Sequence, residues 1–368
     1  MSQTSDFLVI GGGMAGVSAA TFLSEKARVT VLETETTPGY HATGRTAAIY
    51  IRNYGNATLR ALNAAAHDFL VEPEGVSEAS LLSPRGELMI AAEDELPTFD
   101  AYLAGAAGME RLTADEAVEL FPILRPELIA AAAIEREAMD IDVDRFLQGL
   151  IRLLRERGGD IVTDAPVGTL TRTDGIWTAE TRAGSFSAPV VINAAGAWAD
   201  PVAKLAGAKP LSITPMRRSA ALLPAPEGYA IDTWPLVASA SERWYAKPEA
   251  GKMMVSPADE TPVEPHDAWA EEMDLAEGLY RFEQAVTTPV TRVETSWAGL
   301  RSFAPDRTPV CGFDGAREGF FWLAGQGGYG IQTAPAMARL TAQLCLGEKP
   351  DLSPVTIAAL DPRRFDGA

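Results

Sequence analysis

The chain has 368 residues, of which 47% are hydrophobic and 22% charged, with a formal net charge of -19 at pH 7. This length allows two or three domains with a large core, and the composition is typical of a globular protein. The acidic balance argues against nucleic acid as a partner, because phosphate binding requires a basic surface.

Cysteine and histidine are scarce, with two and three residues respectively. Two cysteines are too few for a disulfide framework or a structural zinc site, and the histidines lack metal-ligand spacing, so we expect no metal. The first residues form no charged leader, and no apolar run is long enough to span a bilayer. We therefore expect no transmembrane segment and a cytoplasmic location, while the sequence does not indicate the oligomeric state.

The N-terminal residues predict a strand, a helix and a second strand. Residues 7–10 are a short apolar run typical of a buried parallel strand, 17–23 suit a helix, and 28–32 suit another strand that ends at Glu33. Residues 11–16, between the first strand and the helix, read GGGMAG and satisfy the GxGxxG pattern. This complete context predicts a dinucleotide-binding βαβ unit.

Each residue of this fingerprint has a physical role. Gly11 permits the tight turn from strand to helix, Gly13 lets the backbone approach a pyrophosphate, and Gly16 allows close packing of the helix on the strand. Glu33 lies at the expected distance to accept hydrogen bonds from a ribose diol. The fingerprint alone does not distinguish FAD from NAD.

Downstream of Glu33 the sequence predicts alternating helices and strands separated by turns. A long polar, glycine-containing loop at 37–48 comes first. The further elements expected are a helix at 57–71, a strand at 88–92, a helix at 113–121, an amphipathic helix at 144–157 with Asp144 as N-cap, strands at 160–162, 175–181 and 190–193, a turn into a helix near 198, strands at 219–223, 243–246 and 253–255, an acidic helix at 270–286, and a strand at 319–324 followed by a glycine-rich turn and a helix.

The βαβ signals occupy the beginning, middle and end of the chain, with strand-rich segments between them. This order predicts an α/β fold in which a Rossmann-like dinucleotide domain is discontinuous in sequence. We assign residues 1–82, 143–210 and 300–368 to this domain, and residues 83–142 and 211–299 to an α+β, sheet-rich substrate-binding domain.

Several ordered motifs together resemble the D-amino-acid oxidase/glycine oxidase superfamily of FAD-dependent oxidoreductases. They are GGGMAG at 11–16, GRTAA at 44–48, NAAGAW at 193–198, GLR at 299–301 followed by Pro305-Asp306, and GGYGIQ at 327–332. Residues 38–41, 82–85, 217–220 and 297–303 look most like the bacterial D-arginine dehydrogenases within it. The resemblance implies a cofactor domain of the glutathione-reductase type.

The resemblance also implies that the cofactor is FAD. Some sarcosine oxidases hold their flavin through a cysteine near the position of Gly299, and this stretch has none, so we expect non-covalent binding. The residues expected to contact FAD are Gly11, Gly13, Met14, Ala15, Gly16, Glu33, Thr34, Gly44, Arg45, Thr46, Ala47, Ala48, Val167, Ala195, Gly196, Gly327, Gly328, Gly330, Ile331 and Gln332.

Four residues are candidates for the catalytic site. Arg301 is the first candidate for a carboxylate anchor, because a guanidinium binds a carboxylate through two parallel hydrogen bonds. The resemblance adds Arg218, although the residues alone do not distinguish it from Arg217. It also matches Tyr54 and Tyr245 to tyrosines that bind the substrate carboxylate or shape the pocket, where the residues alone indicate core aromatics.

Five residues are candidates for substrate binding. The Gly328 carbonyl could accept a hydrogen bond from the substrate amine, and the resemblance matches Glu87 to a glutamate that binds a distal cationic group. Ile49 stands where the D-arginine enzymes carry an active-site histidine. Leu236 and Ala238 also differ in size from the matching pocket residues. These three departures leave the substrate range open.

The sequence and the resemblance together predict an enzyme that oxidises the Cα–N bond of a basic or large D-amino acid by hydride transfer to flavin N5. The imine would hydrolyse to a 2-oxo acid and ammonia. One alternative is an oxidase or dehydrogenase of secondary amines, of the glycine or sarcosine type. A non-catalytic flavin-binding protein is an alternative of another class, and the electron acceptor, oxygen or a quinone-type carrier, stays open.

Overall fold

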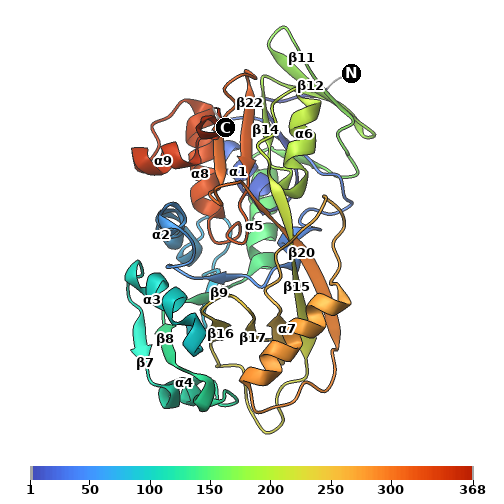
Figure 1. Ribbon diagram of the computed structural model, residues 1–368. Coiled ribbons are helices and arrows are strands. Elements are labelled where there is room, and N and C mark those ends of the chain that lie inside the picture. Colours follow the sequence, from blue (N-terminus) through green and yellow to red (C-terminus); the bar gives the residue numbers. More distant parts are fainter. Residues whose placement is uncertain (1–2, 367–368) are drawn as a thin grey trace.

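The predicted N-terminal unit is present in the computed structural model, which describes residues 3–366. The buried apolar strand β2 (Phe7–Ile10) lies parallel to β3 (Val29–Leu32), and α1 (Met14–Leu23) connects them. Helix α1 is rich in alanine and is buried on almost every side, as expected for a helix packed between other layers. This unit begins the upper half of the molecule in Figure 1.

The upper half is a three-layer structure around a six-stranded sheet. From edge to edge, its strands are β10 (Asp160–Val162), β3, β2, β14 (Val190–Asn193), β22 (Phe320–Ala324) and β21 (Val310–Phe313). All neighbouring pairs are parallel except β21 with β22. Helices α1, α5 (Val143–Glu156) and α8 (Ala334–Leu346) cover one face, with α2 (Ala57–Val71) and α9 (Pro354–Leu360) beyond them.

The second face of the six-stranded sheet packs on a smaller sheet and a short helix. The small sheet contains β1 (Gln3–Thr4), β13 (Gly184–Ala188), β12 (Ile176–Thr181) and β11 (Thr169–Thr173). Trp177 of β12, Phe186 of β13 and Ala203 of the short helix α6 (Ala199–Leu205) share this layer of the core. Residues far apart in sequence therefore form one domain around β2 and β14.

The expected N-cap of α5 is wrong by two residues. The Asp142 carboxylate accepts a hydrogen bond from the Arg145 amide at 2.9 Å, so Asp142 is the N-cap and the helix starts at Val143. Asp144 lies in the first turn instead, where a negative charge is also favourable. Asp142 and Asp144 both suit an N-cap by residue type, and the backbone conformation determines which of them caps the helix.

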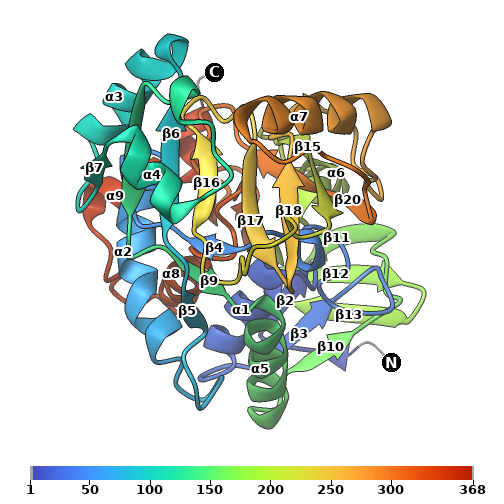
Figure 2. The same ribbon diagram turned by 90° about the horizontal axis from the view of Figure 1, so that it is seen from below.

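The lower half of the molecule is built on a nine-stranded sheet (Figures 1 and 2). Its strands run β19 (Thr261–Pro262), β15 (Thr214–Leu223), β18 (Lys252–Ser256), β17 (Tyr245–Glu249), β16 (Leu236–Ser239), β6 (Glu87–Ala91), β8 (Ala131–Glu135) and β7 (Glu110–Leu112), while β20 (Thr295–Phe303) also pairs with β15. Only β16 and β6 are parallel neighbours. A three-stranded sheet of β4 (Ile49–Tyr50), β9 (Met139–Ile141) and β5 (Leu82–Pro84) also forms.

The two faces of the nine-stranded sheet have different neighbours. Helices α4 (Ala114–Leu120) and α7 (Glu272–Ala285) cover the outer face, where α7 crosses β17, β18 and β15 (Figure 2). The inner face carries α3 (Leu96–Ala104) at one edge and otherwise faces the upper half.

Three short helical turns lie in the connections: η1 (Ala42–Arg45), η3 (Pro126–Leu128) and η4 (Gly196–Trp198). Turns η2 (Glu93–Glu95) and η5 (Pro362–Phe365) complete the set assigned within residues 3–366.

The proposed division into two domains follows the two large sheets with one exception. Strand β20 crosses the expected boundary between residues 299 and 300 and pairs with β15 along its whole length. The division itself remains a proposal.

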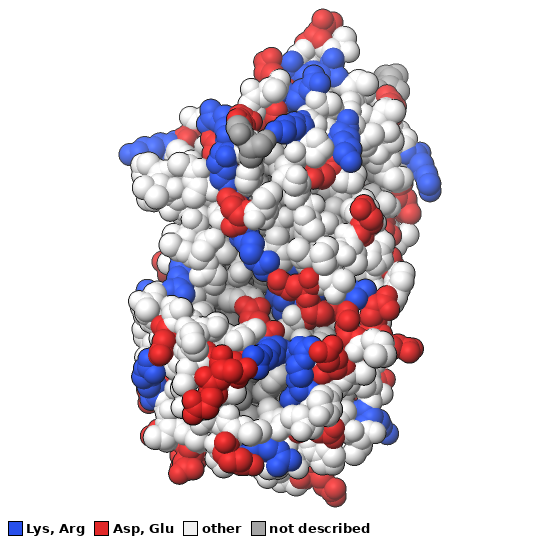
Figure 3. Space-filling model, in the orientation of Figure 1, with Lys and Arg blue, Asp and Glu red and all other residues white. Residues whose placement is uncertain are grey.

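Across residues 3–366, each helix is too short or too polar to cross a lipid bilayer. On the face shown in Figure 3, Lys and Arg are interspersed with Asp and Glu and do not gather in one patch.

Candidate active site

A cavity of about 510 Å³ runs from the N-terminal fingerprint to the inner face of the nine-stranded sheet. It begins where β2, β3 and β14 end, which is where ligands bind in open α/β sheets. The predicted cofactor residues on its wall are Gly11, Gly13, Met14, Ala15, Glu33, Thr34, Arg45, Thr46, Ala47, Val167, Ala195, Gly196, Gly327, Gly328, Gly330 and Ile331. Most of the set predicted from sequence thus shares one elongated space.

The fingerprint glycines fit a bound dinucleotide. Gly11 has a φ of 110°, and a Cβ there would lie 2.4 Å from the Ala194 carbonyl oxygen. A Cβ on Gly16 would lie 1.9 Å from the Gly11 carbonyl oxygen, so close packing of α1 requires glycine. Gly196 has a φ of 54° and nothing within 4 Å of its Cβ position, which leaves space on the cavity side.

Glu33 closes the end of the cavity beside the fingerprint. One carboxylate oxygen accepts from the Gly12 amide at 2.6 Å, and the other accepts from the Glu35 amide at 2.8 Å. Each oxygen retains a further acceptor site for a hydroxyl group. The position and the remaining acceptors suit a ribose diol, as the sequence predicts.

Four residues predicted to contact FAD do not line this cavity. Gly16 packs α1 against the preceding turn, Gly44 lines a second cavity, and Ala48 packs against the core of the upper half. Gln332 is buried and donates a hydrogen bond to the Asn63 side chain at 2.7 Å. In the structure these four residues pack against, or form hydrogen bonds with, other parts of the protein. Direct contact with FAD remains a proposal for them.

Three of the five substrate candidates, Glu87, Leu236 and Ala238, lie on one face of the nine-stranded sheet. Glu87 is paired with Leu236, and Ala238 is paired with Tyr245. Directly paired residues point to the same side of a sheet, and residues two apart on a strand do so too. The same alternation along β18 and β15 puts Arg218 on this inner face, and its partner strand β20 carries Arg301 there.

Arg301 combines exposure to the cavity with an unusual lack of partners. Its Nη1 donates to the Tyr54 hydroxyl at 3.4 Å, and no carboxylate among residues 3–366 forms a salt bridge with it. A Cβ added to Gly328 would lie 2.8 Å from the same Nη1, so the turn at Gly328 passes directly beside the guanidinium. Several N–H groups of Arg301 are therefore available to an anion in the cavity.

The structure distinguishes the two neighbouring arginines of β15. Arg218 lines the cavity, donates to the Asp259 carbonyl at 2.8 Å and pairs with Glu260 at 3.1 Å. Arg217 points to the outer face and pairs with Asp274 of α7 at 2.5 Å. Since Arg218 already has an acidic partner, Arg301 is the stronger candidate for the carboxylate anchor.

The pKa values of Tyr54 and Tyr245, which lie near Arg301 and Arg218, shift in opposite directions. Burial raises the pKa of Tyr54 well above its usual value. Burial also acts to raise the pKa of Tyr245, but the charges of Arg301 and Arg218 outweigh it and lower that pKa overall. The Arg218 guanidinium carbon lies 5.9 Å from the Tyr245 ring centroid. The substrate end of the cavity thus favours a negative charge.

Glu87 is buried beyond the wall of the cavity, on the same inner face. Burial, followed by the charges of Glu135 and Glu242, raises the pKa of Glu87 to about 8. Its Oε2 has no hydrogen-bond partner among the described residues, and neither does the nearby Tyr102 hydroxyl. Ile49, Leu236 and Ala238 also lie outside the wall of the cavity, so roles for all four toward a substrate remain proposals.

The residues that hold Tyr54 in place are not recognisable from local sequence patterns. The Glu135 carboxylate accepts from the Arg52 amide at 2.7 Å and from the Asn53 side chain at 2.6 Å. The Asn63 side chain donates to the Tyr54 carbonyl at 3.1 Å. Glu135 is adjacent to Glu87 on the neighbouring strand, and only knowledge of the strand pairing would have revealed it.

Comparison with known proteins assigns the family. The family model described as DAO, FAD dependent oxidoreductase, matches residues 6–344. The chain therefore belongs to the DAO family of FAD-dependent oxidoreductases. Its cofactor is FAD, which agrees with the fit of the cavity described above. The predicted mixed α/β architecture with a Rossmann-like cofactor half is confirmed.

Two curated relatives and two solved structures illustrate the range of similar proteins. FAD-dependent oxidoreductase domain-containing protein 1 of Bos taurus is 26% identical, with 94% of this chain and 82% of that protein covered. Human mitochondrial dimethylglycine dehydrogenase is 26% identical over 67% of this chain, which spans only 30% of that protein.

Among solved structures, glycine oxidase from Geobacillus kaustophilus has a TM-score of 0.84 at 22% identity, with 97% of this chain and 98% of that chain covered. L-proline dehydrogenase from P. horikoshii has a TM-score of 0.86 at 22% identity, with 100% and 99% covered. At these identities the solved structures support the fold alone.

Proposed function

We propose that the protein oxidises the Cα–N bond of an amino acid whose α-carboxylate binds Arg301. We further propose a D-amino acid with a basic or large side chain, following the resemblance to D-arginine dehydrogenases. The observation that carries the proposal is the position of Arg301, which lines the FAD cavity with Tyr54 as its only hydrogen-bond partner among the described residues. A protein that only stored flavin would not need an unpaired guanidinium there.

The residues around Arg301 would hold the substrate in a single orientation. Two N–H groups of Arg301 bind the carboxylate, and the Tyr54 hydroxyl and the Arg218–Tyr245 pair enclose it. Gly328 lines the cavity beside Arg301, and its carbonyl would accept a hydrogen bond from the amine. FAD, when bound, supplies the hydride acceptor. The chain's contribution is mainly to position Cα and to restrict its motion.

A cationic side chain would extend along the inner face toward Glu87. This carboxyl group has a pKa of about 8 when nothing pairs with it, so it is mostly protonated at pH 7. A guanidinium or ammonium beside the unpartnered Oε2 would favour the ionised form and supply the missing hydrogen bond. This arrangement supports a basic substrate.

A second candidate function is oxidation of a secondary amine such as an N-methyl amino acid. When the substrate has no cation, Glu87 itself is protonated and carries no charge, and Ile49 is apolar. Dimethylglycine and sarcosine dehydrogenases are among the curated relatives, and glycine oxidase is among the similar structures. Arg301 would bind the carboxylate in either case.

Two further properties belong to this proposal. We propose that FAD is held without a covalent bond to cysteine, because neither Cys311 nor Cys345 lines the cavity. A cytoplasmic location is also proposed, on the sequence alone.

The decisive experiment is anaerobic mixing of the holoenzyme with amino acids while the flavin absorbance is followed. We expect D-arginine, D-lysine or large D-amino acids to bleach the flavin, and the L-enantiomers not to do so. Bleaching by sarcosine-type amines alone would replace the first candidate with the second. An Arg301→Ala variant that keeps its flavin but is not bleached by any of these amines would support the anchor; an unaffected variant would disprove it.

A further inference from the structure

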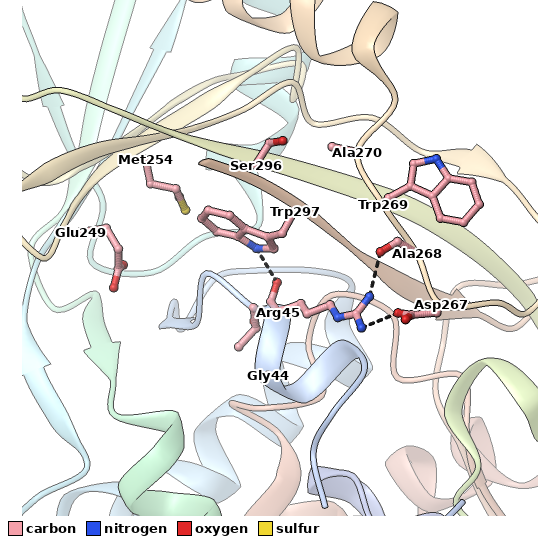
Figure 4. A pocket seen from close by; sticks show the side chains of 11 residues that line it. Gly44, Arg45, Glu249, Met254, Asp267, Ala268, Trp269, Ala270, Ser296 and Trp297 are labelled. Carbon is pink, nitrogen blue, oxygen red and sulfur yellow. Dashed lines mark hydrogen bonds and ion pairs between the residues drawn. The ribbon is translucent and has the colours of Figure 1, made fainter. Parts of the chain in front are cut away.

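A second cavity of about 600 Å³ lies beside the cofactor cavity at the edge of the nine-stranded sheet. Figure 4 shows the indole of Trp297 at its centre, with Met254 and Glu249 on one side in this view and Trp269 on the other. The Trp269 side chain is 61% exposed, so the cavity is reached from solvent past an aromatic rim. None of the proposed roles in amine oxidation uses this space.

The two cavities share a wall. Arg45, Thr46, Ala268 and Trp297 line both of them. Hydrogen bonds hold this wall together: the Trp297 indole N–H donates to the Arg45 carbonyl at 3.0 Å, and Arg45 Nη1 donates to the Ala268 carbonyl at 2.8 Å (Figure 4). A molecule in the second cavity would therefore be separated from the FAD cavity by a single layer of residues.

The chemistry of the second cavity favours a planar, uncharged aromatic ligand. Its charged groups already have partners: Arg45 pairs with Asp267, and Glu249 pairs with Lys247 at 2.9 Å. The uncharged lining includes the exposed indole of Trp269, the partly buried indole of Trp297 and, beneath the surface, Met254, which is 1% exposed. Indole faces stack on aromatic rings, and a thioether packs against them at its edge. The net charge of -19 disfavours an anionic ligand.

We propose that this cavity binds the electron acceptor, a neutral molecule of the quinone class. Oxidation of the amine to the imine releases a hydride, which bound FAD would accept, and one proton, which would go to solvent. A quinone in this cavity would take two electrons and one proton from the reduced cofactor and a second proton from solvent, and would leave as the hydroquinone. The proposal depends on FAD and on the shared wall, and not on the identity of the amine substrate.

Equilibrium dialysis of the oxidised holoenzyme against menadione, a neutral naphthoquinone, tests the binding site. Trp269→Ala should weaken binding by about two- to tenfold, the range of one aromatic contact. Ser296→Trp should reduce binding by at least about tenfold, because the indole would fill part of the cavity. Tyr280→Ala, which removes an equally exposed aromatic (61%) from α7, is the matched control and should leave binding unchanged.

A second measurement separates this proposal from the proposed amine oxidation. The holoenzyme is photoreduced without any amine and is mixed anaerobically with menadione, and the return of flavin absorbance is followed. The reoxidation rate should saturate with menadione concentration, and Trp269→Ala should raise the half-saturating concentration by about the factor seen in dialysis. Equal affinity in Trp269→Ala, Ser296→Trp and the unmodified enzyme, or displacement of menadione by the amine substrate, would overturn the proposal.

Discussion

Glu87 provides a prediction in which the charge state of one buried group controls substrate selectivity. Its side chain is among the buried residues at 5% exposure, its Oε2 has no partner, and its pKa is about 8. At pH 7, one unit below this pKa, ionisation of Glu87 costs about 1.4 kcal/mol. At pH 9 the group is already ionised and this cost is nearly absent.

A cationic substrate therefore gains from a rise in pH and an apolar substrate does not. We expect the ratio of kcat/KM for D-arginine to kcat/KM for D-methionine to rise by about tenfold between pH 7 and pH 9, the factor equivalent to the 1.4 kcal/mol. Both substrates must lose a proton from the α-amine, so the ratio cancels that titration. The guanidinium stays charged throughout the range.

Steady-state kinetics of the unmodified enzyme and Glu87→Gln provide the assay. The amide cannot ionise, so the variant's ratio should be low and independent of pH. Glu74→Gln, at an exposed glutamate remote from the cavity, should behave like the unmodified enzyme. A ratio that stays constant in the unmodified enzyme, or equal losses for both substrates in Glu87→Gln, would refute this reasoning.

The same pKa shift has a consequence for stability, with a defined sign. Below the ordinary pKa of 4.5 the carboxyl group is protonated in both the folded and the unfolded chain. Between 4.5 and about 8 it is protonated only in the folded chain, so its contribution to the free energy of unfolding falls by up to about 1.4 kcal/mol per pH unit. In urea denaturation, Glu87→Gln should thus gain stability relative to the unmodified protein as pH rises from 5 to 8.

Four further substitutions test the anchor, its support and the cofactor turn. Arg301→Lys should lower kcat/KM for every amine substrate by roughly 10- to 100-fold, from loss of charge-assisted bonds worth about 1.5–3 kcal/mol; Arg218→Lys, which starts from a paired residue, should cost less in the same assay. Glu135→Gln should retain flavin absorbance but slow anaerobic flavin reduction, because one acceptor that fixes the loop before Tyr54 becomes a donor; an unchanged rate would count against that positioning role. Gly16→Ala should be purified largely without FAD, and a fully loaded variant would contradict the clash with the preceding turn.

Features confined to a short stretch of sequence could be predicted well. The fingerprint, the flanking strands and Glu33 lie within 33 residues, and each one restricts the local backbone directly. The structure accordingly contains β2, α1 and β3 close to the expected positions, and Glu33 lies on the cavity wall. Family membership and FAD, which followed from the order of the motifs, are confirmed as well.

Features that depend on strand pairing could not be predicted. Arg217 and Arg218 are adjacent and both buried, so only the alternation of β15 and the location of α7 decide which one enters the cavity. Glu135 becomes important because β8 pairs with β6 and places its carboxylate beside Glu87. The sequence also gave no expectation for α3, whose apolar face is completed by residues of β6 and β8.

Ile49 stands where a histidine base is expected from the resemblance, and the neighbouring Lys247 is the residue to consider as its replacement. Ile49 pairs with Asp140 in the small sheet, and Asp140 binds Lys247 at 2.9 Å and Arg85 at 2.7 Å. Lys247 lies on the inner face two residues from Tyr245, but Asp140 and Glu249 together hold its ammonium group. It is therefore a poor substitute for a histidine base. We therefore expect selectivity among amines to depend mainly on the charge state of Glu87 on the inner face, because Arg301 would bind the carboxylate of each of them.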